Sequence, residues 1–368
     1  MIPAELLAAA ELETGLTDWG DDSFREGLEI YCRSLVEEAQ LNELGALAMQ
    51  GNLHGQLTNR LKVIDYAKGR ELEPVVEPVF VIGLFRAGTT LLSNLLDQDP
   101  ANRSLLNWEA ADCVPPPTPA DFRTGPRVEA AAGKLAMLDM LNPRLSAIHR
   151  EDASTPTECI TLMAQDFKAL LWESVANVPS YGEWLLATDH TSAYRHHKLC
   201  LQVLQSGGVT GQWNLKSPHH ALALDALTAV YPDAKLVYLH RDPVEVAASA
   251  FSLIGCLSGT FSDADHSDYI REHWTEVLVQ CVERVDAFRD AHPEVPIHDL
   301  RYSDLLADPI ASVKGLYAFL GRELEVADRM SAYLERNPKG KHGRHDYDVA
   351  GAAELRERFR AYVDRYDP

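Results

Sequence analysis

The sequence predicts an α/β protein with a single phosphate-loop-like domain, in which helices flank a central, mostly parallel sheet. Strand-like runs alternate with helical patterns, and they lie at Val79 to Ile82, Trp213 to Lys216, Lys235 to His240 and Ile297 to Tyr302. Such alternation is typical of parallel strands joined by crossover helices on both faces of a sheet. The first run also leads into a glycine-spaced turn that opens a helix, as phosphate-binding loops do.

A helical segment precedes the first strand. From Glu5 to about Lys68, apolar residues recur at three- and four-residue intervals, as they do on one face of a helix. We therefore expect residues 1–75 to form a helical preface packed on the core, and residues 76–368 to form the α/β domain. Residues 102–206 of that domain are predicted to form a largely helical insertion, and an insertion of this length is typical of a substrate pocket or lid.

Two local patterns in the insertion give specific expectations. Thr155-Pro156-Thr157-Glu158 combines a capping box with a proline at the first helical position, so a helix should begin there. His196 and His197 lie on a polar helix, which predicts that both rings face solvent.

Composition narrows the classes of function. The 368 residues include 34 lysines and arginines against 55 aspartates and glutamates, a net charge of −21. This charge argues against nonspecific binding to nucleic acid or anionic membranes, so an anionic ligand would need a local basic pocket. The six cysteines are scattered and indicate neither a disulfide framework nor a zinc site. No basic leader or bilayer-length apolar run is evident, which predicts a cytoplasmic location and no stable membrane insertion.

The turn from Gly83 to Thr90 has the glycine spacing of the nucleotide-binding G-x-x-x-x-G-K-[ST] loop. Thr89 stands where that loop has its lysine, and Arg86 supplies a positive charge earlier. Because the missing lysine would clamp the β- and γ-phosphates, triphosphate chemistry is disfavoured. The loop amides, a threonine hydroxyl and one arginine still suit a 5′-phosphate that carries a transferable group. An ordinary strand-to-helix connection is the alternative for this segment alone.

Polar residues also follow the other strands. Lys216 and His219 follow the second strand, and Arg241 follows the third. Asp242 is expected to cap the next helix and to hold Arg241 at the edge of the sheet, although Arg241 could simply pair with Asp242 or Glu245. Because the carboxyl ends of parallel strands meet at one edge, these residues predict a binding crevice there.

This set of motifs resembles the sulfotransferases that use 3′-phosphoadenosine-5′-phosphosulfate (PAPS), most closely the bacterial branch whose loop reads P-R-S-G-T-T. The resemblance extends over most of the chain. It implies that the 5′-phosphosulfate loop consists of Arg86, Ala87, Gly88, Thr89 and Thr90. It implies further nucleotide contacts by Arg241 and Ser249 at the 3′-phosphate, Tyr302 near adenine, and the Lys339-Gly340-Lys341-His342-Gly343 loop, which resembles K-G-x-x-G.

The chain departs from the family pattern at several of these positions. Phe85 and Ala87 replace the usual proline and serine of the loop, so a serine hydroxyl is missing while the backbone amides remain. Pro338 stands where an arginine commonly precedes the K-G-x-x-G loop, which leaves Lys339, Lys341 and Arg344 as substitutes.

The resemblance implies transfer of a sulfuryl group from PAPS to a hydroxyl, with PAP as the product and no metal. Arg86, the loop amides and Lys216 would hold the leaving 5′-phosphate in an in-line transfer. Two residues are candidates for the base that takes the acceptor proton. Glu109 resembles the catalytic glutamate of several members, with a salt bridge to Arg86 as the alternative role. His219 lies near the family's lysine-to-histidine region, although the usual spacing is two, and it could instead be a histidine in the first turn of a helix.

Two other functions are alternatives to this one. A kinase-like phosphotransferase with an atypical loop is disfavoured by the missing lysine and by the lack of a clear acidic strand end for magnesium. A degenerate binding or scaffold module is disfavoured because Arg86, Lys216, Arg241 and Ser249 are all present. The acceptor is expected to be a small molecule, a lipid or a sugar, and the sequence leaves the oligomeric state open, a homo-oligomer included.

Overall fold

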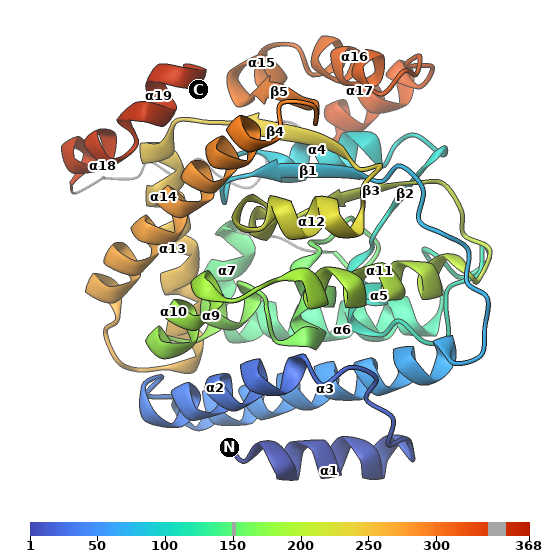
Figure 1. Ribbon diagram of the computed structural model, residues 1–368, viewed down its shortest axis with the longest axis vertical. Helices are drawn as coiled ribbons and strands as arrows, with labels where there is room; N and C mark the ends of the chain where they lie inside the picture. Colours follow the sequence, from blue (N-terminus) through green and yellow to red (C-terminus); the bar gives the residue numbers. More distant parts are fainter. Residues whose placement is uncertain (149–151, 338–350) are drawn as a thin grey trace. The chain divides into compact units, whose positions relative to one another are not determined.

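The computed structural model describes residues 1–148, 152–337 and 351–368 (Figure 1). The chain divides into two compact units. The first unit consists of Met1–Val75, Leu105–Thr210 and Ile254–Ser267, and the second consists of Val76–Ser104, Gly211–Leu253 and Asp268–Pro368. Each unit therefore combines segments that are distant in sequence, and the sheet belongs to the second.

The sheet of the second unit has the strand order β2-β3-β1-β4-β5. Its strands are β1 (Val79–Gly83), β2 (Asn102–Ser104), β3 (Gln212–Lys216), β4 (Lys235–His240) and β5 (Ile297–Arg301). All the pairings between these strands are parallel. The predicted parallel sheet with flanking helices is confirmed, and the short edge strand β2 was not predicted.

Both faces of the sheet are buried, as in other parallel sheets. On one face, Val79 and Val81 of β1 and Val237 and Leu239 of β4 pack in one apolar cluster with α4 (Thr89–Leu96) and α16 (Pro309–Phe319). On the other face, the ring of Phe80 packs edge-on against His220 and Tyr231. These alternating contacts follow from the two-residue period of a strand.

The remaining helices of the second unit lie between and after its strands. They are η2 (Pro218–Leu222), α12 (Leu224–Val230), α15 (Tyr302–Ala307), α17 (Ala327–Arg336), α18 (Ala352–Arg358) and α19 (Arg360–Tyr366). Tyr302 begins α15, whereas the sequence placed it at the end of a strand. Two long helices, α13 (Pro243–Phe261) and α14 (Ser267–Ala291), have residues in both units.

Helix α13 is apolar along most of its length. Among the described residues it is the helix that is long and apolar enough to cross a membrane by length and composition. Half of its most apolar window is buried within the protein, as in the core helix of a folded domain.

The first unit is helical. Its helices are α1 (Pro3–Thr14), α2 (Phe24–Glu37), α3 (Glu43–Ala67), α5 (Asn107–Ala111), α6 (Pro126–Leu141), α7 (Pro143–Ile148), α8 (Ile160–Met163), η1 (Ala164–Asp166), α9 (Leu171–Val175), α10 (Pro179–Ala187) and α11 (Thr191–Gln205). The helical pattern seen up to Lys68 matches α1, α2 and α3.

The predicted helix start at Thr155 is wrong, because α8 begins only at Ile160. The backbone of the intervening segment pairs with another part of the chain. The N–H of Thr157 donates to the carbonyl of Leu105 at 2.8 Å, and Pro156 forms a β-bridge with Leu106. These contacts with a distant segment take the place of the capping hydrogen bonds that a helix beginning at Thr155 would have formed within itself.

The expectation that His196 and His197 face solvent is also wrong, since both are buried on α11. Nε2 of His196 lies 2.9 Å from the side-chain oxygen of Gln165. Burial lowers the pKa of His197 to about 3, and it lowers the pKa of His196 well below its ordinary value. Both rings are therefore neutral parts of the core of the first unit.

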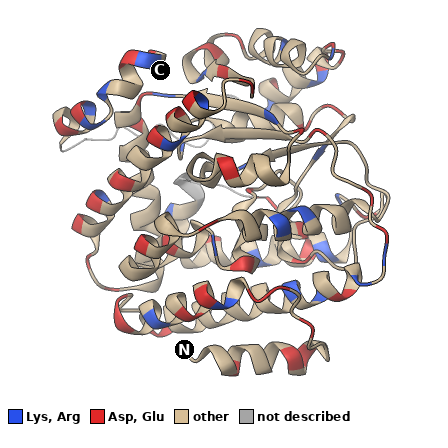
Figure 2. Ribbon diagram, viewed as in Figure 1, with Lys and Arg blue, Asp and Glu red and all other residues tan. Residues whose placement is uncertain are grey.

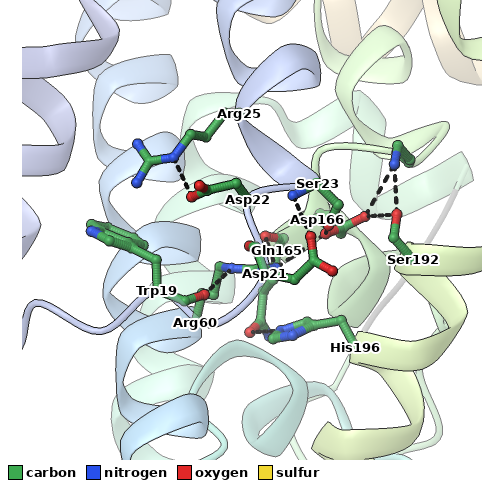
Figure 3. A network of polar contacts seen from close by, with 12 residues as sticks. Trp19, Asp21, Asp22, Ser23, Arg25, Arg60, Gln165, Asp166, Ser192 and His196 are labelled. Carbon is green, nitrogen blue, oxygen red and sulfur yellow. Dashed lines mark hydrogen bonds and ion pairs between the residues drawn. The ribbon is translucent and has the colours of Figure 1, made fainter.

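A network of charged groups lies beside His196 (Figure 3). Asp166 accepts hydrogen bonds from Ser23 at 2.7 Å and Ser192 at 2.6 Å, and it forms an ion pair with Arg60 at 3.2 Å. Nζ of Lys168 lies 3.6 Å from the same carboxylate. The network joins residues of α3, η1 and α11, and it supplies hydrogen-bond partners to the buried charges, without which burial would be costly.

Candidate functional site

The candidate site is built from the carboxyl ends of four neighbouring strands in the second unit. The register pairs Val81 of β1 with Lys216 of β3, and Gly83 of β1 with Leu239 of β4. His240, which directly precedes Arg241, pairs with Arg301, which directly precedes Tyr302. The strand ends that carry the predicted site residues therefore meet at one edge of the sheet within this unit, which is where open α/β sheets bind ligands.

Gly88 ends the loop between β1 and α4 and directly precedes the first residue of that helix. Its φ of +98° is a backbone conformation that glycine adopts without a steric penalty. A Cβ atom at this position would lie 2.4 Å from Cδ2 of the Tyr302 ring. The loop can therefore approach the tyrosine only because residue 88 has no side chain. Thr89 follows as the first residue of α4 and is buried, while Thr90 is exposed.

Phe85 and Ala87, the two departures in the loop, are both buried. The ring of Phe85 packs edge-on against Trp274 of α14, with centroids 5.1 Å apart. The N–H of Ala87 donates to the carbonyl of Leu84 at 3.1 Å, which closes the turn. Aromatic packing thus anchors the loop at the position where the family usually has proline.

Arg86 has a φ of +65°, which is uncommon for a residue with a side chain. Its Nε donates a hydrogen bond to Oγ of Ser249 at 3.2 Å. This contact joins the loop to α13, so two residues that the resemblance assigned to the nucleotide are direct neighbours.

Arg241 makes contacts to three of its neighbours. Its Nη1 donates to the carbonyl of Arg86 at 2.7 Å, and its guanidinium lies over the ring of Tyr302, 4.4 Å from the centroid. It also pairs with Glu245 at 3.0 Å, as the simpler interpretation suggested, although Glu245 is largely exposed. The carboxylate of Asp242 accepts from the N–H groups of Val244 and Glu245, which confirms its predicted capping role.

Lys216 and His219 are both buried at the end of β3. His219 lies in η2, where its N–H donates to Oγ of Ser217 at 3.2 Å. His219 is therefore a histidine in the first turn of a short helix, and it lies in the same unit as Lys216 and the loop.

Glu109 belongs to the first unit. It is fully buried on α5, where its Oε1 accepts a hydrogen bond from the N–H of Leu106 at 3.0 Å. Its carboxylate thus caps the N-terminus of that helix. The predicted contacts of Lys339, Gly340, Lys341 and His342 lie outside the described residues.

The arrangement gathers Arg86, Lys216 and Arg241 at strand ends of a protein whose helices carry many acidic side chains, as Figure 2 shows for α2 and α14. Such a site can bind phosphate groups through guanidinium and ammonium donors and through the backbone at the start of α4. Within the described ranges, no group of three or more histidine, cysteine or acidic side chains could hold a metal ion. The contact between Gly88 and Tyr302 was missed by sequence reasoning, because nothing in either motif shows that they meet.

Comparison with known proteins decides the family. A model described as the sulfotransferase family matches residues 78–326, which include the loop and the ends of β3, β4 and β5. The chain belongs to the sulfotransferase family. This sulfotransferase is a PAPS-dependent enzyme, as the resemblance predicted, and the kinase-like alternative is not favoured.

Solved sulfotransferases match nearly the whole chain. STF9 from Mycobacterium avium is 31% identical and matches 99% of this chain and 96% of its own, with a TM-score of 0.88. STF1 from Mycobacterium tuberculosis H37Rv is 29% identical and matches 98% of this chain and 99% of its own, with a TM-score of 0.85. Omega-hydroxy-beta-dihydromenaquinone-9 sulfotransferase Stf3 from Mycobacterium bovis is 24% identical over 308 residues, which are 78% of this chain and 74% of that protein.

Proposed function

We propose that this sulfotransferase binds PAPS at the carboxyl ends of β1, β3, β4 and β5 and transfers its sulfuryl group to the hydroxyl of a small, lipid-like acceptor. The observation that carries the proposal is the group formed by Arg86, Ser249, Arg241 and Tyr302 around the turn at Gly88. Two guanidinium groups, a hydroxyl and an aromatic ring are the side chains expected around a doubly phosphorylated adenosine.

Each part of the nucleotide is assigned to residues that follow a different strand. Residues 86–90, at the start of α4, would bind the 5′-phosphosulfate, because backbone N–H groups and Arg86 can neutralise it there. Arg241 and Ser249 would bind the 3′-phosphate, and Tyr302 would lie against adenine. The turn at Gly88 fits this role, because it brings backbone into a space that a Cβ atom would fill. Lys339, Gly340, Lys341 and His342 remain predicted contacts to the 3′-phosphate.

The donor supplies the sulfuryl group. As the acceptor oxygen bonds to sulfur, the bond from sulfur to the 5′-phosphate oxygen breaks, and its electron pair stays on the phosphate of PAP. Arg86, Lys216 and the loop amides would stabilise that charge. They lie on strand ends that the sheet fixes, so little reorganisation accompanies the reaction.

A base must also take the proton of the acceptor hydroxyl, and Glu109 and His219 remain the candidates. His219 is supported by its position three residues after Lys216, in the same unit as the loop. Glu109 is supported by its resemblance to a catalytic glutamate, although its carboxylate also caps α5.

We infer the class of acceptor from the substrate of a relative. Stf3, by its name, acts on omega-hydroxy-beta-dihydromenaquinone-9, which carries a hydroxyl on an apolar chain. A hydroxylated, lipid-like acceptor is therefore the first class to assay for this enzyme, followed by sugars and smaller alcohols. The cytoplasmic location remains a prediction.

Thermal melting with adenosine 3′,5′-bisphosphate (PAP) and with ATP plus magnesium tests the proposal. A ligand at 100 times its Kd adds about 2.7 kcal/mol to the folded state, which a melting curve resolves. We expect PAP to raise the Tm and ATP with magnesium to have little effect. A rise with ATP and magnesium alone would overturn the proposed donor site.

A further inference from the structure

The guanidinium of Arg241 carries a carboxylate on one of its edges. Its Nε and Nη2 both donate hydrogen bonds to Oε2 of Glu245, at 3.2 and 3.0 Å. Glu245 lies four residues further along the chain, in the first turn of α13. A guanidinium binds two oxygens of a phosphate through such a pair of neighbouring donors. The carboxylate thus occupies an edge of Arg241 that suits a phosphate.

The opposite edge of the guanidinium, formed by Nη1 and Nη2, also has a partner. Nη1 donates to the carbonyl of Arg86 at 2.7 Å, so this edge is shared with the backbone of the loop. A phosphate that binds Arg241 therefore either displaces the carboxylate of Glu245 or lies beside it on the same guanidinium. Displacement breaks an ion pair, and a position beside the carboxylate brings two negative groups together. In both arrangements Glu245 opposes the binding of phosphate.

The position of Arg241 depends little on Glu245. Its guanidinium lies over the ring of Tyr302, 4.4 Å from the centroid, and the bond to the carbonyl of Arg86 holds it on the other side. The side chain of Arg241 is 23% exposed, whereas that of Glu245 is 63% exposed. An ion pair with such an exposed partner contributes little to stability, because water solvates the carboxylate. Loss of the charge of Glu245 should therefore leave the guanidinium in place.

We propose that Glu245 is a specificity-determining residue that competes with the 3′-phosphate of the nucleotide for Arg241 and thereby lowers the affinity of the enzyme for PAPS and PAP. The inference rests on the proposed function, in which Arg241 contacts that phosphate. The effect falls mainly on nucleotides that carry a 3′-phosphate, because the competition takes place on one guanidinium. Weaker binding of PAP favours release of this product after each turnover.

The test compares Glu245→Gln with the wild type in calorimetric binding of PAP and of 5′-AMP, which lacks the 3′-phosphate. Glutamine keeps the size of the side chain and an acceptor oxygen for Arg241, and it removes the charge. We expect the variant to bind PAP about fivefold more tightly, the size expected for an exposed ion pair, and to bind 5′-AMP within about twofold of the wild type. The gain for PAP should shrink between about 0.05 M and about 0.5 M salt, because salt screens exposed charges.

Glu357→Gln is the matched control. Glu357 pairs with Arg360 on the surface of the same unit, and it lies on α18, away from the strand ends of the candidate site. The substitution removes the same charge from the protein and should leave both affinities unchanged.

Three results would each overturn the competition: an unchanged or weaker PAP affinity in Glu245→Gln, an equal gain for both nucleotides, or a gain that does not depend on salt. Arg241→Ala separates this inference from the proposed function. If Arg241→Ala keeps the wild-type ratio of the PAP and 5′-AMP affinities, the proposed 3′-phosphate contact has itself failed. If Arg241→Ala lowers that ratio while Glu245→Gln leaves it unchanged, only the competition is refuted.

Discussion

Nε of Arg86 donates a hydrogen bond to Oγ of Ser249 at 3.2 Å, although 163 positions separate the two residues in the chain. The contact links the loop after β1 to α13. We expect the two side chains to act as a unit in nucleotide binding, because removal of either one leaves the other without this partner.

A double-mutant cycle with Arg86→Ala and Ser249→Ala measures this coupling. Their losses of PAP affinity should fall short of additivity by about 1 kcal/mol, or about fivefold. Ser258→Ala is the control, because Ser258 lies on the same helix and bonds to the carbonyl of Ile254 instead. Its effect should add to that of Arg86→Ala. Strict additivity in the first cycle would show that the contact carries no binding energy.

Gly88→Ala should reduce PAP affinity by about tenfold or more. The φ of +98° is strained for alanine, and its Cβ would lie 2.4 Å from the Tyr302 ring, so the ring must move away from Arg241. Gly315→Ala is the matched control, because that glycine lies within α16 with open space around its Cα. Alanine at position 315 should stabilise the fold by about 0.5–1 kcal/mol and leave the PAP affinity unchanged. Wild-type PAP affinity in Gly88→Ala would refute the tight turn.

The strands of the core and the capping of α13 were predictable, because each rests on a local pattern. Val79–Gly83 and Lys235–His240 are apolar runs, and Asp242 precedes Pro243 as a cap precedes the first turn. Strand β2 has no such pattern. Its three residues, Asn102 to Ser104, are polar, and they form a strand only because β3 offers a free edge.

The positions of the proposed site residues at strand ends were predictable, whereas their mutual contacts were not. Spacing placed Arg86, Arg241 and Tyr302 at strand ends, but the hydrogen bond from Arg241 to Arg86 and the packing of Arg241 on the Tyr302 ring depend on register between strands distant in sequence. The same reason explains the error at His196. Its helix looks polar in isolation, and only Gln165, from another segment, makes burial of the ring acceptable.

Glu109→Gln and His219→Ala should be compared for turnover and for PAP binding. The true base should lose about 10²–10⁴-fold in kcat and keep its PAP affinity. The amide oxygen of glutamine can still accept from the N–H of Leu106, so Glu109→Gln tests the charge without removing the cap of α5. A change in Tm alone would mark Glu109 as structural. Normal turnover in both variants would eliminate both candidates.

Asp166→Asn should destabilise the protein by about 3–5 kcal/mol, because it leaves the buried charges of Arg60 and Lys168 without their carboxylate. Asp22→Asn is the control. Asp22 pairs with Arg25 at 2.6 Å on the surface, where such a pair contributes about 0.2–1 kcal/mol. Urea unfolding measures both, and equal losses would show that the buried network carries no more stability than a surface pair (Figure 3).

Stability should fall as the pH decreases from about 6.5 towards 3, in part because His197 is buried as a neutral ring with a pKa of about 3. In the unfolded chain this ring takes up a proton below about 6.5, whereas in the folded protein it does not. The unfolded state therefore binds more protons in this window, and the free energy of unfolding rises with pH across it.

For one histidine the loss at pH 5.5 is about 1.4 kcal/mol relative to pH 7.5, and His196 adds a loss of the same sign. Urea unfolding of the wild type and of His197→Asn at the two pH values isolates the contribution of His197 from that of the carboxylates, which both proteins share. The variant should lose about 1.4 kcal/mol less than the wild type between the two values. Parallel pH curves for His197→Asn and the wild type would mean that the ring takes up its proton without unfolding.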